Sequence, residues 1–213
     1  MPSPHVFLSA ASADFKQLRN ELADSLRRAG CTVKHQNDFV PTGGQTLEKL
    51  AEYLRGCAVV VHVIGPQFGA MAEQPSVDGL RHEYGPAFLA AARWSRLHAA
   101  LNDPGVGWYA LSYTQWEAYL ALHHERRLLA YQKDADGWDK RQTDHVARLR
   151  AVDIFPVSFV DEAELKLAIL ESLHNILLIE YPDQAGKLER QLRRIIHLPY
   201  PTLGRLFKGR KPS

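Results

Sequence analysis

Residues 58–64 read Ala-Val-Val-Val-His-Val-Ile, and this stretch decides the fold. A near-continuous run of β-branched residues is typical of a strand in the middle of a parallel sheet, because helices cover such a strand on both faces. Two further apolar stretches, residues 5–9 and 31–35, precede it and are separated by helical patterns. Strands that alternate with helices return through crossovers, which predicts a parallel sheet with helices on both faces.

The regular alternation lapses after Gly65 and resumes near residue 112. Connections in such folds usually span about 2–6 residues, so residues 66–111 are predicted to be an insertion that is functional or has structure of its own, with a helix over 86–101. The later segments are predicted as a helix at 113–124, a strand at 127–132, a helix at 143–150, a strand at 154–159 and a helix at 161–179. Five strands in this pattern predict a flavodoxin-like α/β fold with the sheet order 2-1-3-4-5 and any ligand at the carboxyl ends of the strands.

The end of the chain differs in charge from the rest. Residues 184–213 carry eight Lys or Arg residues and one Glu, while the net charge of the whole chain is +2. Apolar residues at helical spacing predict an amphipathic helix after residue 181, followed by a linker, both outside a main domain at 1–180. We expect a solvated basic face rather than nucleic-acid binding, because no aromatic residues are interleaved for base stacking.

Several classes of site are not expected. No apolar run is long enough for a membrane span and the first residues do not resemble a signal peptide, so a cytoplasmic protein without membrane contact is predicted. Cys31 and Cys57 each open an apolar stretch and are expected to be buried thiols rather than a disulfide. The ten histidines lack the spacing of metal ligands, so no metal site is predicted.

Glu117 is the residue that breaks the pattern. The stretch from Ser112 to Gln115 is typical of a capping box, which starts the predicted helix at Tyr113. In that register Tyr113, Trp116 and Glu117 share the face that packs on the sheet or lines its rim. A carboxylate in the second turn lies beyond the strong part of the helix dipole, so capping does not explain it. It either pairs with an arginine at the sheet edge or serves a function.

Three segments resemble the Toll/interleukin receptor (TIR) family in their order along the chain. They are Val-Phe-Leu-Ser-Ala-Ala-Ser-Ala-Asp-Phe at 6–15, Asp-Phe-Val-Pro-Thr-Gly-Gly at 38–44, and Ser-Tyr-Thr-Gln-Trp-Glu at 112–117. The resemblance covers residues 6–179 and implies that Glu117 is a catalytic glutamate that cleaves NAD. Two features depart from the family: the insertion is long and contains a rival carboxylate, Glu83, and Tyr113 stands where tryptophan is common.

The resemblance also implies a set of contacts. Phe7, Ser9 and Phe39 would touch the dinucleotide, and Tyr113 or Trp116 would stack on a ring, although core packing explains each of these residues equally well. The loop with Asp38, Gly43 and Gly44 would mediate contacts between neighbouring domains. NAD would be the substrate, with no further cofactor, and the product would be linear or cyclic ADP-ribose.

The last segment suggests a larger assembly. Residues 203–210, Leu-Gly-Arg-Leu-Phe-Lys-Gly-Arg, resemble the linker before the nucleotide-switch module of STAND-type (NLR-like) NTPases. The resemblance implies an N-terminal effector of bacterial anti-phage immunity that acts when a downstream NTPase or repeat sensor clusters it. Two alternatives stay open: a non-catalytic adaptor that signals by TIR–TIR self-association, and an enzyme similar to nucleoside 2-deoxyribosyltransferases.

Overall fold

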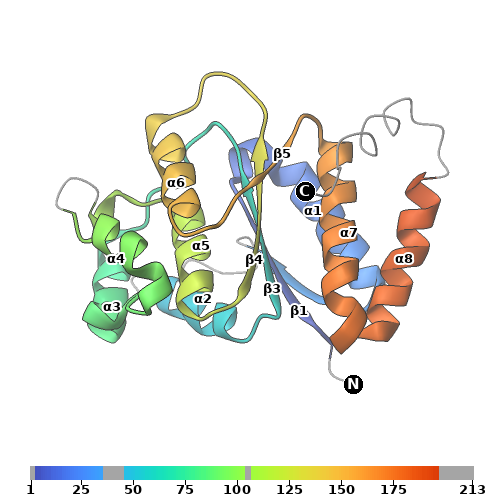
Figure 1. Ribbon diagram of the computed structural model, residues 1–213, viewed down its shortest axis with the longest axis horizontal. Helices are drawn as coiled ribbons and strands as arrows, with labels where there is room; N and C mark the ends of the chain where they lie inside the picture. The colour runs from blue at the N-terminus through green and yellow to red at the C-terminus, as the bar shows by residue number, and fades with distance from the viewer. Residues whose placement is uncertain (1–2, 36–45, 104–106, 197–213) are drawn as a thin grey trace.

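The fold is a five-stranded parallel sheet between two layers of helices (Figure 1). The computed structural model describes residues 3–35, 46–103 and 107–196. The strand order is β2-β1-β3-β4-β5, so the predicted α/β fold class and strand order are confirmed. The strands are β1 (His5–Ala10), β2 (Thr32–His35), β3 (Val59–Ile64), β4 (Arg127–Lys133) and β5 (Val157–Phe159).

Strand β3 lies at the centre and is buried at every position, as its β-branched sequence predicts. Strands β1 to β4 begin and end within one residue of the predicted bounds. The prediction for the last strand is wrong over residues 154–156. There, Asp153 has a positive φ of 62° and the Ile154 amide bonds back to Leu149 of the preceding helix. Pro156 then lacks the N–H that a strand ladder needs, so β5 is short.

The two faces of the sheet are covered by different helices (Figure 1). One face packs on α2 (Thr46–Arg55), α5 (Tyr113–His123) and α6 (Lys140–Arg150). The other packs on α1 (Ser12–Arg28) and α7 (Glu162–Glu180), and α8 (Pro182–Ile196) lies outside these two helices. Side chains alternate between the two faces of a strand. Val59, Val61 and Val63 of β3 are therefore buried in the core on the α1 and α7 face, whereas Val60 and Ile64 are buried in the core on the α2, α5 and α6 face. His62 therefore faces α5 and α6.

The insertion is a packed outer layer. It contains α3 (Gln74–Tyr84), α4 (Ser95–Leu101) and three short 3-10 turns, η3 (Gly85–Ala87), η4 (Ala92–Trp94) and η5 (Trp108–Ala110). The predicted helix over 86–101 is wrong in its first half. Gly85 has a φ of 45°, Pro86 follows it, and Leu89 has a φ of 54°, so regular helix resumes only at Ser95.

This outer layer buries α5 from its second side. Trp116 of α5 packs against both Phe88 and Trp108 of the insertion, with ring centroids 5.5 and 5.4 Å away. All residues from Thr114 to Leu122 are buried. The insertion therefore covers the side of this helix that would otherwise meet solvent.

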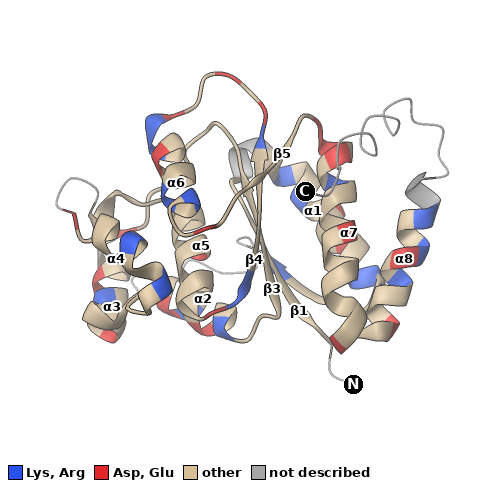
Figure 2. Ribbon diagram, viewed as in Figure 1, with Lys and Arg blue, Asp and Glu red and all other residues tan. Residues whose placement is uncertain are grey.

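Helix α8 packs against α7 and α1. Ala185, Leu188 and Leu192 are buried in the core of that face, and the Gln191 side chain donates a 3.0 Å hydrogen bond to the Ser25 carbonyl. The predicted amphipathic helix is thus present as part of the packed structure, and the predicted linker lies outside the described residues. Figure 2 shows that charged residues lie mainly on the helices and loops, whereas the strands are mostly free of them.

The two cysteines are free thiols in separate cores. Cys31 lies on the α1 face and Cys57 on the α2 face. Burial raises the pKa of Cys31 to about 11 and that of Cys57 to about 12, so neither is a reactive thiolate near neutral pH. Within the described ranges, no helix combines the length and apolar character of a membrane span.

Candidate functional site

Glu117 is buried at the carboxyl end of β1. The capping box that fixes its position is present: the Gln115 amide donates to Ser112 Oγ over 3.2 Å, and the Ser112 amide donates to Gln115 Oε1 over 3.4 Å. The register predicted from the sequence is therefore confirmed. The Glu117 side chain points to β1, where it hydrogen-bonds Ser9, and the residue is only 2% exposed.

Arg19 approaches the same carboxyl group from the opposite side of the sheet. It lies on α1, is 1% exposed, and its Nη1 donates a 3.0 Å hydrogen bond to the carbonyl of Ala10, the last residue of β1. Its charge acts on Glu117. Because α1 and α5 cover opposite faces, the two residues lie on opposite sides of β1 near its end and interact through charge. This rim borders the point where the strand order reverses, which is where α/β sheets bind ligands.

The protonation state of Glu117 follows from this environment. Burial raises its pKa to about 8, while the Ser9 hydrogen bond and the Arg19 charge lower it in part. Desolvation therefore outweighs the basic neighbour, and Glu117 is mostly a neutral acid at pH 7. Such a shift is a property that catalytic carboxyl groups share, although structural networks produce it too.

A chain of buried polar side chains continues from Ser9 across the face of the sheet. Ser9 Oγ lies 2.7 Å from His62 Nδ1, and His62 Nε2 lies 2.9 Å from His145 Nε2. His145 Nδ1 lies 2.7 Å from the Tyr119 hydroxyl, which accepts a 2.8 Å hydrogen bond from Arg148 Nε. We call this set the polar chain; its members are Glu117, Ser9, His62, His145, Tyr119 and Arg148.

The strand register brings the first members together. Ser9 and His62 are direct neighbours on β1 and β3, and Ala130 of β4 is the neighbour of His62 on its other side. The small Ala130 side chain leaves room beside His62, and His145 reaches it from α6. Every member except the half-buried Arg148 is buried.

The ionisable groups of the chain are all neutral near pH 7 apart from Arg148. Burial lowers the pKa of His62 to about 3 and, together with the nearby His62 and Arg148, holds that of His145 well below its usual range. Burial also raises the pKa of Tyr119 to about 12. The histidines therefore act as neutral rings that donate at one nitrogen and accept at the other.

A second polar cluster holds α5 and α6 in place. The Gln115 side-chain amide donates to the Arg141 carbonyl and to Gln142 Oε1 over 3.1 and 3.0 Å, and Gln142 donates to the carbonyl of Gly65 over 3.1 Å. These bonds join α5, α6 and the end of β3. Gln142 and His145 are three residues apart on α6 and therefore lie on the same face of the helix. The hydrogen bonds of Gln142 thus also fix the position of His145.

The other predicted contact residues are placed differently. Phe7 is fully buried and packs on Tyr53, and Trp116 is fully buried in the aromatic cluster of the insertion. Both serve core packing in this structure. Tyr113 is half-buried, and its hydroxyl accepts a 3.2 Å hydrogen bond from the Glu73 amide. The remaining predicted residues, Phe39, Asp38, Gly43 and Gly44, lie outside the described residues.

The rival carboxylate Glu83 lies elsewhere. It forms a 3.6 Å ion pair with Arg55, and both side chains are exposed. Arg55 ends α2, just before β3 begins, so this pair lies towards the amino ends of the strands. Glu83 is therefore far along the strand direction from the rim that holds Glu117.

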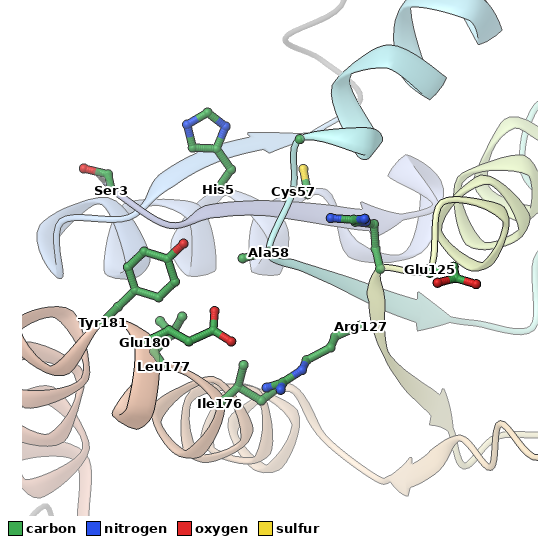
Figure 3. Close-up of a pocket in the computed structure, with 12 residues that line it drawn as sticks. Ser3, His5, Cys57, Ala58, Glu125, Arg127, Ile176, Leu177, Glu180 and Tyr181 are labelled. Atoms are coloured by element: carbon green, nitrogen blue, oxygen red, sulfur yellow. The ribbon is translucent and has the colours of Figure 1, made fainter. Parts of the chain in front are cut away.

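Cavity sizes also distinguish the two ends of the sheet. The hollow lined by Ser9 and Arg19 has a volume of about 10 Å³, which is far below the roughly 300–1,000 Å³ of ligand pockets. A pocket of about 460 Å³ lies instead at the amino ends of the strands, and Figure 3 shows His5, Arg127 and Glu180 around it. Among the cavities lined by described residues alone, ligand-sized space thus lies at the edge opposite to the predicted site, and Glu117 itself is buried.

The part of the chain that the structure describes contains no cluster of side chains suited to bind a metal ion. No group of three or more His, Cys, Asp or Glu residues is arranged to hold an ion there. The rings of His62 and His145 are nearly perpendicular to each other and share a 2.9 Å hydrogen bond.

Comparison with known protein families finds a match for part of the chain. Residues 5–98, less than half of the chain, match the family model described as a domain of unknown function, DUF4062. No curated protein matches this chain. The matched segment holds Ser9, Arg19 and His62 but ends before Glu117 and the α6 members of the polar chain. Its description states no activity, so the resemblance to TIR domains stays a prediction.

Proposed function

We propose that this chain is a TIR-type enzyme that cleaves the bond between nicotinamide and ribose in NAD, with Glu117 as its catalytic residue. One observation carries the proposal: among the residues whose burial is described, Glu117 is the one buried acid, and it lies at the carboxyl end of β1 beside the reversal of strand order. A buried acid destabilises a fold once it ionises, so its position is better explained by a task than by stability.

The chemistry requires a carboxylate rather than an acid. Nicotinamide leaves as a neutral molecule from a cationic ring, so breaking the bond needs no proton donor, but positive charge develops on the ribose. An ionised Glu117 would stabilise that charge, as carboxylates do in glycosidases. Water as the acceptor gives ADP-ribose and a proton, whereas attack by an adenine nitrogen gives a cyclic product. Because burial raises the pKa of Glu117 to about 8, we expect cleavage to increase as pH rises towards that value.

Substrate access requires a change at the rim. A ribose cannot reach a residue that is only 2% exposed. We therefore include self-association in the proposal: contact between copies, through the segment with Asp38, Gly43 and Gly44, would open or complete the site. The downstream sensor module, the bacterial anti-phage role and the cytoplasmic location belong to the same proposal.

The second candidate is a non-catalytic module that acts by self-association. The burial of Glu117 favours it, since the residue would then only bond to Ser9 and balance the charge of Arg19. In that case the carboxyl group would anchor α5 to β1 and the protein would release no nicotinamide.

The test compares matched carboxylates. We expect the concentrated protein, incubated with NAD, to release nicotinamide, which chromatography quantifies, and Glu117→Gln to lower the rate by about a hundredfold or more. Glu83→Gln is the control, because that exposed carboxylate should leave the rate unchanged. Equal rates for wild type and Glu117→Gln, or no release of nicotinamide even from the concentrated protein, would exclude the proposed enzyme. The non-catalytic module that acts by self-association would then remain.

A further inference from the structure

The polar chain ends at a group that can only donate. Arg148 Nε donates to the Tyr119 oxygen, and arginine offers no acceptor. Each remaining member can both donate and accept: two hydroxyl groups and two neutral imidazole rings, each ring bonded through both of its nitrogens. The direction of every hydrogen bond therefore depends on what the other end, Glu117, requires.

An ionised Glu117 sets one direction. A carboxylate only accepts, so the Ser9 hydroxyl donates to it and accepts from the Nδ1–H of His62. His62 Nε2 then accepts from the Nε2–H of His145, and His145 Nδ1 accepts from the hydroxyl of Tyr119. Tyr119 in turn accepts from Arg148. Each of these donors has an acceptor, and both histidines are neutral, with the proton on Nδ1 in His62 and on Nε2 in His145.

A protonated Glu117 sets the opposite direction. Its O–H donates to Ser9, Ser9 donates to His62 Nδ1, His62 Nε2–H donates to His145 Nε2, and His145 Nδ1–H donates to the Tyr119 oxygen. That oxygen has a second lone pair for Arg148. Both rings have exchanged tautomers and neither has become charged.

The two arrangements differ by one proton, and the path between them balances. A proton arriving at the Tyr119 oxygen releases the phenol proton to His145 Nδ1. His145 passes its Nε2 proton to His62, His62 passes its Nδ1 proton to Ser9, and Ser9 passes its own to Glu117. One proton enters at Tyr119, next to the half-buried Arg148, and one is bound at Glu117. The three heavy-atom distances between Ser9, His62, His145 and Tyr119, 2.7–2.9 Å, suit such transfers, and the Ser9 hydroxyl is also a hydrogen-bond partner of Glu117.

We propose that the polar chain is a proton path in which His62 and His145 switch tautomers together whenever Glu117 gains or loses its proton. His62, His145 and Tyr119 are positioning residues, since they act on Glu117 through Ser9. The charged group that acts on Glu117 itself is Arg19 of α1, and Arg148 of α6 acts on Tyr119 and His145. A role of the proton path in catalysis rests on the proposed function. The experiment that tests the path measures only the protonation of the side chains.

The test is a pH titration followed by ¹⁵N NMR of the histidine rings, which distinguishes a protonated from an unprotonated ring nitrogen. In the whole protein we expect His62 to change from the Nε2–H to the Nδ1–H form, and His145 from Nδ1–H to Nε2–H, as pH rises from 6 to 9.5. Both changes should share one midpoint near pH 8, where burial places the pKa of Glu117. Single His→Gln variants assign the signals.

Two variants separate this switch from ordinary titration. Glu117→Gln should abolish the tautomer change over the whole pH range, whereas Glu83→Gln should keep it. Tautomers that do not change in the wild type, or a change that persists in Glu117→Gln, would overturn the proton path. Because NAD plays no part in this measurement, a tautomer switch in a protein that releases no nicotinamide would refute only the enzymatic proposal.

Discussion

The two faces of the same sheet have interiors of different kinds. On the face covered by α1, α7 and α8, β3 contributes valines to a core of aliphatic and aromatic residues. On the face covered by α2, α5 and α6, the same strand contributes His62, and a buried line of hydrogen bonds joins the two strands β1 and β3 to the two helices α5 and α6. Polar groups survive burial there because each bonds to the next, which makes that face more specific in geometry and more sensitive to change.

Stability and pH sensitivity therefore come from different faces of the sheet in this fold. Apolar contacts do not titrate, so the α7 face should hold the domain together equally at any pH near neutrality. The α5 face contains an acid with a raised pKa and two histidines with lowered pKa values. Substitutions on the two faces should therefore differ in their pH dependence as well as in size.

The largest effect should come from the apolar face. Leu170 of α7 is fully buried, so Leu170→Ala should lower the free energy of unfolding by about 2–5 kcal/mol, through lost burial and the cavity left behind. Urea denaturation at pH 6.5 and pH 8 should give the same loss. A loss below about 1 kcal/mol, or one that changes with pH, would show that the two faces are not distinct in this way.

A smaller loss is expected when the polar chain is cut in the middle. His145→Leu keeps a side chain of similar size but leaves His62 Nε2 and the Tyr119 hydroxyl without their partner. We expect a loss of about 2 kcal/mol in the free energy of unfolding, since orphaned buried groups cost about 1–3 kcal/mol. Denaturation curves that overlay those of the wild type would mean that the hydrogen bonds contribute little.

The pH dependence of stability should change in Glu117→Gln. The folded pKa of about 8 lies above the unfolded value of 4.5, so the wild type loses stability as pH rises between these values, by about 1.4 kcal/mol per pH unit. Glutamine does not titrate. The stability of the variant relative to the wild type should therefore increase by about 1.4 kcal/mol from pH 6.5 to 7.5.

This range avoids the buried histidines. Their folded pKa values are lowered, so their effect on stability sets in only as pH falls below about 6.5. Thermal or urea unfolding at the two pH values provides the measurement. A constant difference between variant and wild type would mean that Glu117 is already ionised at pH 6.5.

The smallest effect is expected at the exposed rival carboxylate. Glu83 and Arg55 are solvent-exposed partners, and such pairs contribute less than about 1 kcal/mol. Glu83→Gln should change the free energy of unfolding by less than about 0.5 kcal/mol at both pH values. A larger loss would indicate that the α2–α3 contact depends on this ion pair.

The sequence predicts most of the fold because local patterns dominate it. The β-branched run of β3 and the capping box before α5 are readable from neighbouring residues, and both appear as expected. The structure of the insertion is less predictable, because the glycine and proline at 85 and 86 interrupt the segment whose composition predicts a single helix. The insertion packs on α5 through aromatic residues that are far apart in the sequence, and a periodic pattern of neighbouring residues cannot predict such contacts.

The site is predictable only in part. The register that buries Glu117 follows from the capping box, but the partners of that residue do not. Arg19 reaches it from a helix on the other face, and His62 and His145 meet across 83 residues of sequence. One local signal was available: His62 is a titratable residue inside a run that is otherwise apolar. A polar side chain in the centre of a buried strand demands a partner, and that partner identifies α6 as part of the site.

The most direct test of the account is the titration of the Glu117 carboxyl group itself. Carbon-13 NMR of protein labelled at the glutamate side chains, compared with Glu117→Gln, isolates its signal. The account predicts one carboxyl resonance that titrates near pH 8 and is missing from the variant. If every glutamate titrates below about pH 6, Glu117 is an ordinary carboxylate, and both the buried acid and the proton path to it are contradicted.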